Sequence, residues 1–546
     1  MRYVIVFCVS LCFVSVSHQK STPEDDSYVA AILEYQFTRN TTQNLHNYLD
    51  YIRQAAEKNA DVLVFPEMTL TRGDKIKVPI HGLLKQYPIP ALRPDLYNEI
   101  LVSLSAAARQ HEIYVLVNLQ EEMDCRDAPG EYCPEEKTYV FNTNVVFDRT
   151  GAIIDRYRKI NLFGEYTRHP ALRPELGLFS TDFGVTFGHF ICFDIMFQVP
   201  ATQVVQKHNL TDVLYSTMWF SEMPFLTAVQ TQQEYAYTMN INLIGANANN
   251  VKVATAGSGI YSGNAGALVS VMPGVPSSHL LVARVPKKPG QVTYKYHGPI
   301  FDDPKNNQLF LNKDLTLPAE ISRELTPGFQ EFTLADKGVS CRFRVKTRVN
   351  APEGSQTIPK YRAFVKDGAN TYAKRHIGVV YCAIVACKDD TATSCPYKFS
   401  KDEMFTEFEE LEISMTTYSY QHNSTLDCDN VVYYPTSLRN NKFPLQPLNY
   451  TFTKSQNGAE RLDVCSQNGV NTNGGNLYND VLENSKLEDL SYKLNSAQNE
   501  IVSFGIWGRL YNRDVNPVEN VSEEDVNNYI EIENVIFNAA DKYSTD

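Results

Sequence analysis

Short, wholly apolar runs alternate with amphipathic helical stretches along the first half of the chain. YVAAIL, DVLVFPE and IYVLVNL indicate strands, and residues 42–59 and 96–110 between them have helical periodicity. Strands that are apolar on both faces belong to sheets that are covered on both sides. The pattern therefore predicts a layered α/β domain with helices over its sheets. In the first predicted helix, the apolar stripe consists of Leu45, Leu49, Ile52 and Ala56.

The pattern changes after residue 309. A proline-containing connector, residues 306–329, leads into a region of short β-type runs such as FRVKTRV and HIGVVYCAIVAC. This region contains six of the 11 cysteines of the chain. We expect residues 28–305 to form the α/β domain and residues 330–546 to form a smaller, disulfide-rich, mostly β domain.

Residues 1–17 have the features of a secretory signal peptide. Arg2 precedes an apolar stretch that ends in the small residues Ser-Val-Ser, as signal peptidase prefers. A membrane anchor is the alternative, but this stretch of roughly a dozen residues is shorter than a membrane-spanning helix. No later stretch is long enough, and the polar C-terminus lacks a lipid-anchor signal. We expect a soluble, secreted, extracellular protein without a transmembrane segment.

Five Asn-X-Ser/Thr triplets are consistent with secretion, although such triplets also arise by chance. In a secreted protein each is an acceptor for N-glycosylation. The candidate glycosylation sites are Asn40, Asn209, Asn423, Asn449 and Asn520.

The cysteine count draws attention to one residue. Removal of residues 1–17 would take two of the 11 cysteines and leave nine, an odd number, although extracellular thiols usually pair. Cys125 and Cys133 flank the loop DCRDAPGEYC and are expected to form a local disulfide, whereas the other pairings stay open. Cys192 has no other cysteine near it in the sequence, and we expect it to be the unpaired thiol.

The formal net charge of −13 limits the class of partner. Nucleic acids and anionic membrane surfaces bind to concentrated basic patches, which the sequence lacks. It also lacks the Cys and His spacing of a zinc site. We expect a small-molecule partner and neither metal nor cofactor, and the oligomeric state is left open.

Three reactive side chains stand at the ends of predicted strands. Glu67 ends VLVFPE, Lys159 ends DRYRK and Cys192 lies in FICFD. A thiolate attacks a carbonyl carbon, and a carboxylate can take the thiol proton and return it to the leaving amine. An ammonium can lower the thiol pKa and stabilise the oxyanion together with a backbone N–H after Cys192. These three groups predict amide hydrolysis through an acyl-enzyme.

Several segments, in this order, resemble a known family. VLVFPE, YRKINLFGEY, TDFGVTFGHFICFDI and AGSGIYSG are similar to motifs of the carbon–nitrogen hydrolase (nitrilase) superfamily, and more narrowly of its secreted vanin (pantetheinase) and biotinidase branch. VVYCAIVACKDDTATSCP and FGIWGRLYNRD resemble the C-terminal domain of that branch. The resemblance implies a nitrilase-type αββα sandwich before the β domain. It also implies that Glu67 is the general base, Lys159 the oxyanion stabiliser or proton donor, and Cys192 the nucleophile.

Other residues near these motifs are candidates for supporting roles. Glu165 in NLFGEY is a candidate fourth polar residue of the site, and an exposed loop acid is the alternative. A Cys–His pair with His189 is disfavoured, because an odd offset along a strand sends the two side chains to opposite faces. Asp194 is expected to hold the loop after the nucleophile. Four aromatic side chains are candidates for the substrate pocket, with core packing as the alternative: Phe163, Tyr166, Trp219 and Phe220.

The resemblance favours hydrolysis of pantetheine to pantothenate and cysteamine. Biotinidase-type hydrolysis of biocytin or biotinyl amides uses the same three residues and stays open. An acyl transferase would use the same acyl-enzyme with another acceptor. A non-catalytic extracellular vitamin-binding or interaction protein is the alternative outside enzymes, and the intact set of Glu67, Lys159 and Cys192 argues against it.

Overall fold

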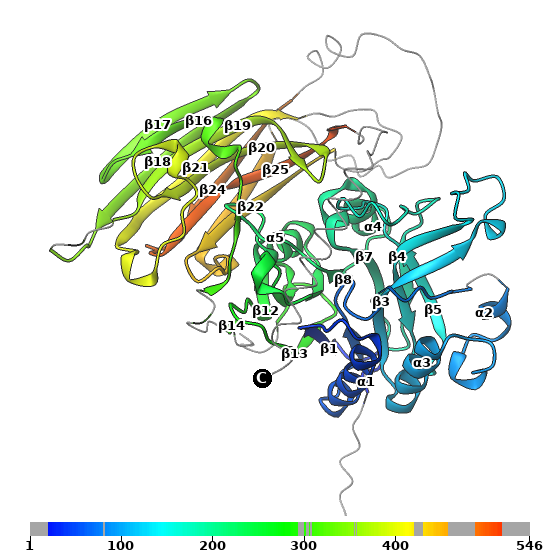
Figure 1. The fold of residues 1–546 in the computed structure, drawn as a ribbon. Helices are drawn as coiled ribbons and strands as arrows, with labels where there is room; N and C mark the ends of the chain where they lie inside the picture. Colours follow the sequence, from blue (N-terminus) through cyan, green and yellow to red (C-terminus); the bar gives the residue numbers. More distant parts are fainter. Residues whose placement is uncertain are drawn as a thin grey trace, which may run out of the picture.

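The computed structural model describes residues 20–71, 73–79, 82–292, 300–301, 305, 308–353, 355, 358–419, 430–456 and 486–515. The predicted signal peptide and the candidate glycosylation sites Asn423 and Asn520 lie outside these ranges, as do Cys428 and Cys465. The described residues form an N-terminal unit of sheets and helices and a C-terminal unit of strands (Figure 1). None of the helices in these ranges has the length and apolar character that crossing a bilayer requires.

Six strands form the first sheet of the N-terminal unit, in the order β13-β1-β2-β3-β4-β5. The helices α1 (Thr41–Glu57) and α3 (Glu99–His111) pack against its outer face. The strands are β1 (Ser27–Glu34), β2 (Val62–Val64), β3 (Tyr114–Asp124), β4 (Thr138–Phe147), β5 (Ile153–Arg158) and β13 (His279–Pro286).

Seven strands form the second sheet, in the order β14-β12-β11-β10-β8-β7-β6. Its inner face packs on the first sheet through a shared apolar core that includes Ile32, Val64, Leu214 and Ile244. Helix α5 (Ala228–Met239) lies on its outer face, which completes the αββα sandwich. The strands are β6 (Gly177–Ser180), β7 (Thr186–Ile191), β8 (Asp212–Thr217), β10 (Asn242–Asn247), β11 (Ser258–Ser262), β12 (Gly266–Val271) and β14 (Ile300–Phe301).

The buried stripe of α1 differs from the predicted one. Leu45 and Leu49 are half-buried, and the fully buried residues of the helix are Asn44, Tyr48, Ile52 and Ala55. Asn44 can be buried because its side chain is fully bonded: its oxygen accepts from Tyr35 and Thr38, and its amide donates to the main chain of Thr38 and Leu70. Ile52 is buried as predicted, and Leu45 and Leu49 pack against the core, so the predicted stripe was incomplete. A count of apolar positions assigns every asparagine to the solvent face.

Two five-stranded antiparallel sheets form the C-terminal unit, as the β-type runs predict. Their orders are β16-β19-β20-β25-β22 and β17-β18-β21-β24-β23, and the disulfide between Cys341 and Cys382 joins one sheet to the other. A second disulfide here connects Cys387 and Cys395. The strands are β16 (Ile321–Leu325), β17 (Gly328–Asp336), β18 (Val339–Val349), β19 (Lys360–Tyr372), β20 (Arg375–Cys387), β21 (Thr406–Ser419), β22 (Val431–Arg439), β23 (Tyr450–Gln456), β24 (Lys486–Leu494) and β25 (Ile501–Val515).

The segment predicted as a connector contributes a strand to each unit. Strand β15 (Asn312–Lys313) pairs in parallel with β9 (Glu222–Met223) of the N-terminal unit, whereas β16 pairs with β19 of the C-terminal unit. The limits proposed for the connector, residues 306–329, therefore include residues of the C-terminal sheet. The pairing of β15 with β9 ties the two units together close to residue 219, where the candidate pocket aromatics lie.

Helix α5 lies between the second sheet and the C-terminal unit. Its Gln230 donates to the hydroxyl of Thr436 at 2.8 Å, and its Gln233 donates to the carbonyl of Leu445 at 2.7 Å. Arg509 of β25 is fully buried and donates to the carbonyl of Met196 at 2.8 Å. Glutamines that would face solvent in an isolated domain are thus satisfied by the neighbouring unit.

Arg509→Met is expected to lower the free energy of unfolding by about 3 kcal/mol, because it leaves buried carbonyl groups and the carboxylate of Asp514 without their donor. Urea unfolding followed by fluorescence measures the change. Arg342→Met, which removes an ion pair with Glu331 on the exposed face of the C-terminal unit, is the matched control and should cost about 1 kcal/mol or less. Equal losses in the two variants would contradict the buried role of Arg509.

Candidate active site

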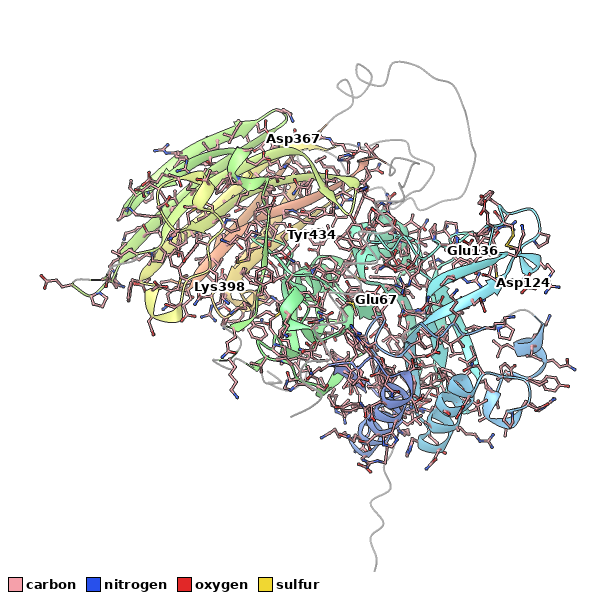
Figure 2. All side chains as sticks on the ribbon, in the orientation of Figure 1. Glu67, Asp124, Glu136, Asp367, Lys398 and Tyr434 are labelled. Carbon is pink, nitrogen blue, oxygen red and sulfur yellow. A yellow bond between two sulfur atoms is a disulfide. The ribbon has the colours of Figure 1, made fainter. Side chains whose placement is uncertain are left out.

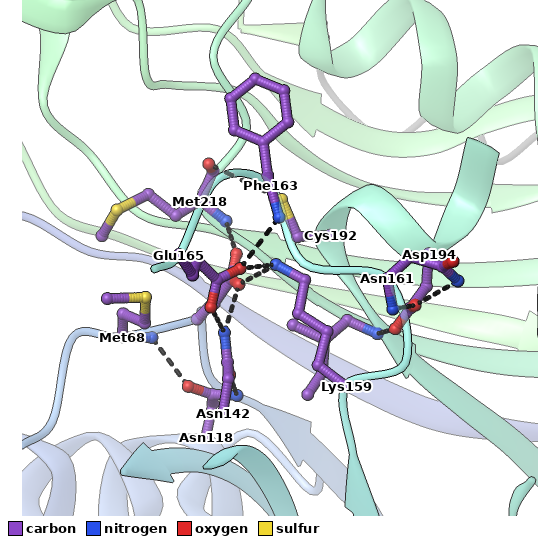
Figure 3. A network of polar contacts seen from close by, with 12 residues as sticks. Met68, Asn118, Asn142, Lys159, Asn161, Phe163, Glu165, Cys192, Asp194 and Met218 are labelled. Atoms are coloured by element: carbon purple, nitrogen blue, oxygen red, sulfur yellow. Dashed lines mark hydrogen bonds and ion pairs between the residues drawn. The ribbon is translucent and has the colours of Figure 1, made fainter. Parts of the chain in front are cut away.

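The ends of three strands bring Glu67, Lys159 and Cys192 into one buried site. Glu67 follows β2, Lys159 directly follows β5 and Cys192 directly follows β7. Figure 2 labels Glu67 within the N-terminal unit, and Figure 3 shows the polar contacts of Lys159, Glu165 and Asn142 close to Cys192. None of the three residues is more than 5% exposed. The edge of the sandwich therefore gathers the three groups that the sequence singles out.

Lys159 lies between two carboxylates. Its ammonium donates to Oε1 of Glu67 at 2.8 Å and also to Oε1 of Glu165. The side-chain amide of Asn142 bridges the same two acids, donating to Glu67 Oε1 at 2.7 Å and to Glu165 Oε2 at 2.9 Å. Glu165 is only 5% exposed, so it is a member of this network and not an exposed loop acid.

The charges of this network stabilise one another. Burial alone would lower the pKa of Lys159, but the carboxylates of Glu165 and Glu67 outweigh burial and raise its pKa well above the ordinary value. Burial would likewise raise the pKa of Glu165, and Lys159 outweighs it, so that this pKa is lowered. Lys159 is therefore a permanent cation, which favours a role as oxyanion stabiliser over a role as proton donor.

The backbone of Cys192 has an uncommon conformation. Its φ of 49° lies in the left-handed region, which side-chain-bearing residues seldom adopt and which is concentrated at functional sites. The hydroxyl of Tyr215 donates to the Cys192 carbonyl at 2.9 Å and holds the turn. The thiol contacts the carbonyl of Met218 at 3.7 Å. Cys192 is the free cysteine of the described residues, and Cys125 forms a disulfide with Cys133.

Burial is the largest influence on the pKa of the Cys192 thiol. Burial raises its pKa far above the ordinary value, and the charge of Glu67 raises it further. Lys159 does lower this pKa, as expected, but the effect is smaller than that of burial. Burial and the charge of Glu67 thus favour the protonated thiol, and Lys159 opposes them.

Asp194 and His189 form hydrogen bonds inside the protein that are consistent with structural roles. Asp194 accepts from the hydroxyl of Tyr157 at 2.7 Å and from the main chain of Asn161 at 2.8 Å, which holds the loop after the nucleophile. Burial raises the pKa of Asp194 to about 6. His189 is bonded to Asp155 at 2.9 Å, so this imidazole is engaged away from the thiol. Within the described ranges, no group of three His, Cys, Asp or Glu side chains is placed to hold a metal ion.

A cavity of about 90 Å³ contains Cys192 in its wall. Three of the four predicted aromatic residues line it, whereas Tyr166 does not and lies 6.0 Å below the ammonium of Lys374. Trp219 is fixed by a hydrogen bond from its indole N–H to the carbonyl of Leu226 at 2.8 Å. The remaining wall residues are Phe163, Phe220, Phe193, Met196, Glu222, Leu226, Asn312 and Tyr372.

The C-terminal unit reaches this cavity. Tyr372, at the end of β19, lines it together with Asn312 of β15, and both residues follow the N-terminal unit in the sequence. Arg375, on the other strand of the same hairpin, donates to the side chain of Asn161 at 2.9 Å. The hairpin thus contacts the loop that continues to Glu165. Sequence patterns contain no signal for contacts between such distant segments.

Two asparagines of the site were not found from the sequence. Asn142 on β4 bridges the two acids, and Asn118 on β3 orients it by donating to its oxygen at 2.8 Å. Asn118 also accepts from the main chain of Met68, the residue after Glu67, at 2.8 Å. One sequence signal could have identified both asparagines. Each is a polar residue among the apolar residues of a strand whose two faces are buried.

Family models match both units of the chain. Residues 29–270 match the carbon–nitrogen hydrolase family, and residues 319–514 match the vanin C-terminal domain. The chain belongs to the carbon–nitrogen hydrolase family and is an amide hydrolase of the nitrilase fold. Its two-unit architecture places it, more narrowly, in the branch that contains the vanins and the biotinidases.

Individual relatives agree with this membership. Vanin-like protein 2 of Drosophila melanogaster is 31% identical over 93% of this chain and 94% of its own length. Human biotinidase is 34% identical over 45% of this chain and 47% of its own length. Among solved structures, an amidase from Nesterenkonia sp. covers 48% of this chain and 92% of its own at 18% identity, with a TM-score of 0.36. Vanin-like protein 1 of the same organism also matches along almost the whole chain, at 30% identity over 91% of it and 88% of its own length.

Asn142→Leu is expected to lower kcat for amide hydrolysis by about 100-fold, because the two acids lose the donor that fixes their spacing. Steady-state kinetics with a saturating amide substrate measure the loss. Asn144→Leu removes a neighbouring buried asparagine that does not contact the acids, and should lower kcat much less. A KM effect without a kcat effect in Asn142→Leu would show that this residue does not position the acids.

Glu67→Gln is expected to slow alkylation of Cys192 by iodoacetamide about tenfold or more, because the variant loses the group that accepts the thiol proton. Electrostatics alone predicts the opposite sign: the charge of Glu67 raises the thiol pKa, so its removal would speed alkylation. Mass spectrometry of the Cys192 peptide over time measures the rate. Faster labelling in the variant would exclude Glu67 as the base.

Proposed function

We propose that this protein is a secreted thiol amidase that cleaves a linear amide through an acyl-enzyme on Cys192, with pantetheine as its substrate. The observation that carries the proposal is the buried arrangement of Lys159 between Glu67 and Glu165 beside an unpaired cysteine in the wall of a cavity. Base, cation and nucleophile are the three groups that this chemistry needs.

In the first half of the reaction, Cys192 Sγ attacks the carbonyl carbon while Glu67 takes the thiol proton. The negative charge that develops on the carbonyl oxygen is stabilised by Lys159 and by the backbone N–H after Cys192. Glu67 then protonates the amine, the carbon–nitrogen bond breaks, and the acyl group stays on sulfur as a thioester.

In the second half, Glu67 activates a water molecule by taking one of its protons. The hydroxide attacks the thioester, and the carbon–sulfur bond breaks to give the carboxylic acid. Glu67 returns its proton to the sulfur, so the resting thiol is restored. The raised pKa of the thiol suits this cycle, because sulfur is regenerated in its protonated form. For pantetheine the products are pantothenate and cysteamine.

Sequence and structure both support secretion. The apolar N-terminus, residues 1–17, has signal-peptide features, and the disulfides of the described residues suit an oxidising compartment. Asn40 and Asn209 are exposed, as glycan acceptors must be, and Asn449 is half-buried. We therefore propose glycosylation at Asn40 and Asn209 in preference to Asn449.

Parallel incubation of the purified protein with pantetheine and with biocytin tests the substrate. Release of cysteamine with biocytin left intact is the expected result, and Cys192→Ala should release neither product. Release of lysine from biocytin alone would instead support the biotinidase-type function, which uses the same residues. Loss of substrate without free acid, in the presence of added amines, would indicate acyl transfer.

If the protein cleaves neither pantetheine nor biocytin, both proposed substrates are excluded. A non-catalytic binder would then be supported by retention of pantothenate or biotin in equilibrium dialysis. Slow labelling of Cys192 by simple thiol reagents is no sign of inactivity here, because burial alone raises the pKa of this thiol.

A further inference from the structure

One carboxylate lies in the wall of the cavity that contains Cys192. Most side chains of this wall are apolar or aromatic, and Glu222 is the one with an acidic group. Glu222 belongs to β9, which pairs with β15, and its main chain exchanges two hydrogen bonds of 3.0 Å with Leu226. The backbone around Glu222 is therefore fixed by pairing on both sides, and its carboxylate has a defined place in the cavity wall.

The Glu222 carboxylate has no hydrogen-bond or ion-pair partner in the part of the chain that the structure describes. The fully buried Glu121, by contrast, accepts from both Arg156 and Arg158. Burial and the nearby charge of Asp314 raise the pKa of Glu222 to about 7. Glu222 is half-buried, and a ligand that supplies a hydrogen-bond donor to its carboxylate gains binding free energy.

The surroundings of Glu222 define the kind of ligand. Phe163, Trp219, Phe220 and Tyr372 line the same cavity and present aromatic surfaces. Such surfaces accommodate a carbon chain, and they also attract a cation. The cavity therefore fits an apolar chain that extends from the scissile amide and carries a hydroxyl or ammonium group where Glu222 can accept a hydrogen bond.

We propose that Glu222 is a specificity-determining residue, which selects amides that carry a hydroxyl or ammonium group on the part of the substrate that fills the cavity. This inference rests on the proposed amide hydrolysis at Cys192 and deepens it by defining the substrate class. Glu222 has no part in bond cleavage. Its effect lies in which amides are held against the nucleophile.

Matched amides test the proposal. The first series consists of the 7-amino-4-methylcoumarin amides of heptanoic, 6-hydroxyhexanoic and 6-aminohexanoic acid, which differ in one terminal group. The second consists of butanoic acid amides of hexylamine, 5-aminopentanol and 1,5-diaminopentane. The enzyme is expected to prefer the donor-bearing compounds over the methyl-terminated ones by about tenfold in kcat/KM in at least one series.

The Glu222 variants separate charge from hydrogen bonding. Glu222→Leu should abolish the preference, whereas Glu222→Gln should keep the preference for hydroxyl and lose that for ammonium. Glu57→Gln, at an exposed position on α1, is the matched control and should keep the wild-type ratios. Thermal unfolding of each variant shows whether it is folded, and the ratio of two substrates in one preparation is insensitive to the fraction of active protein.

Two results would overturn the proposal: no preference in the wild-type enzyme, or wild-type ratios in Glu222→Leu. In both cases amides are still cleaved, so the proposed amidase function would stand. If the wild-type protein cleaves none of these amides and neither pantetheine nor biocytin, the proposed function fails and this inference fails with it.

Discussion

The buried ammonium of Lys159 is the constraint on which the site depends. Two carboxylates, Glu67 and Glu165, lie within hydrogen-bond distance of it in a region almost closed to water. Without the cation, two acids at this spacing would repel each other, and one would take up a proton. Lys159 therefore holds the two acids together beside the thiol, and Asn142 donates to both of them. Strands β2 and β5 of the first sheet and β7 of the second end next to one another, which brings Glu67, Lys159 and Cys192 together.

Much of this could be predicted from the sequence, because some signals are local. Apolar runs and helical periodicity indicated the layers, and short motifs at strand ends identified Glu67, Lys159 and Cys192. The predicted stripe of α1 was incomplete because Asn44 is buried with its hydrogen bonds made inside the protein. The net shift of the thiol pKa could not be predicted, because burial, the larger effect, depends on the whole fold.

The contribution of the C-terminal unit to the site could not be predicted, because it depends on contacts between distant segments. Tyr372 lies more than 150 positions after Cys192 in the sequence, yet both residues line one cavity. The hairpin that carries Tyr372 is an ordinary pair of strands in the sequence, and only packing against the 160–166 loop brings it to the active site. A composition that indicates a separate β domain therefore does not indicate a separate function.

The pairing of β15 with β9 also determines how the molecule can move. The pairing joins main chain to main chain beside the cavity, and α5 is bonded to both units. Swinging the units apart would break these bonds together with the buried contacts of Arg509. A hinge motion between the two units would therefore leave these buried polar groups without partners, at a cost in free energy.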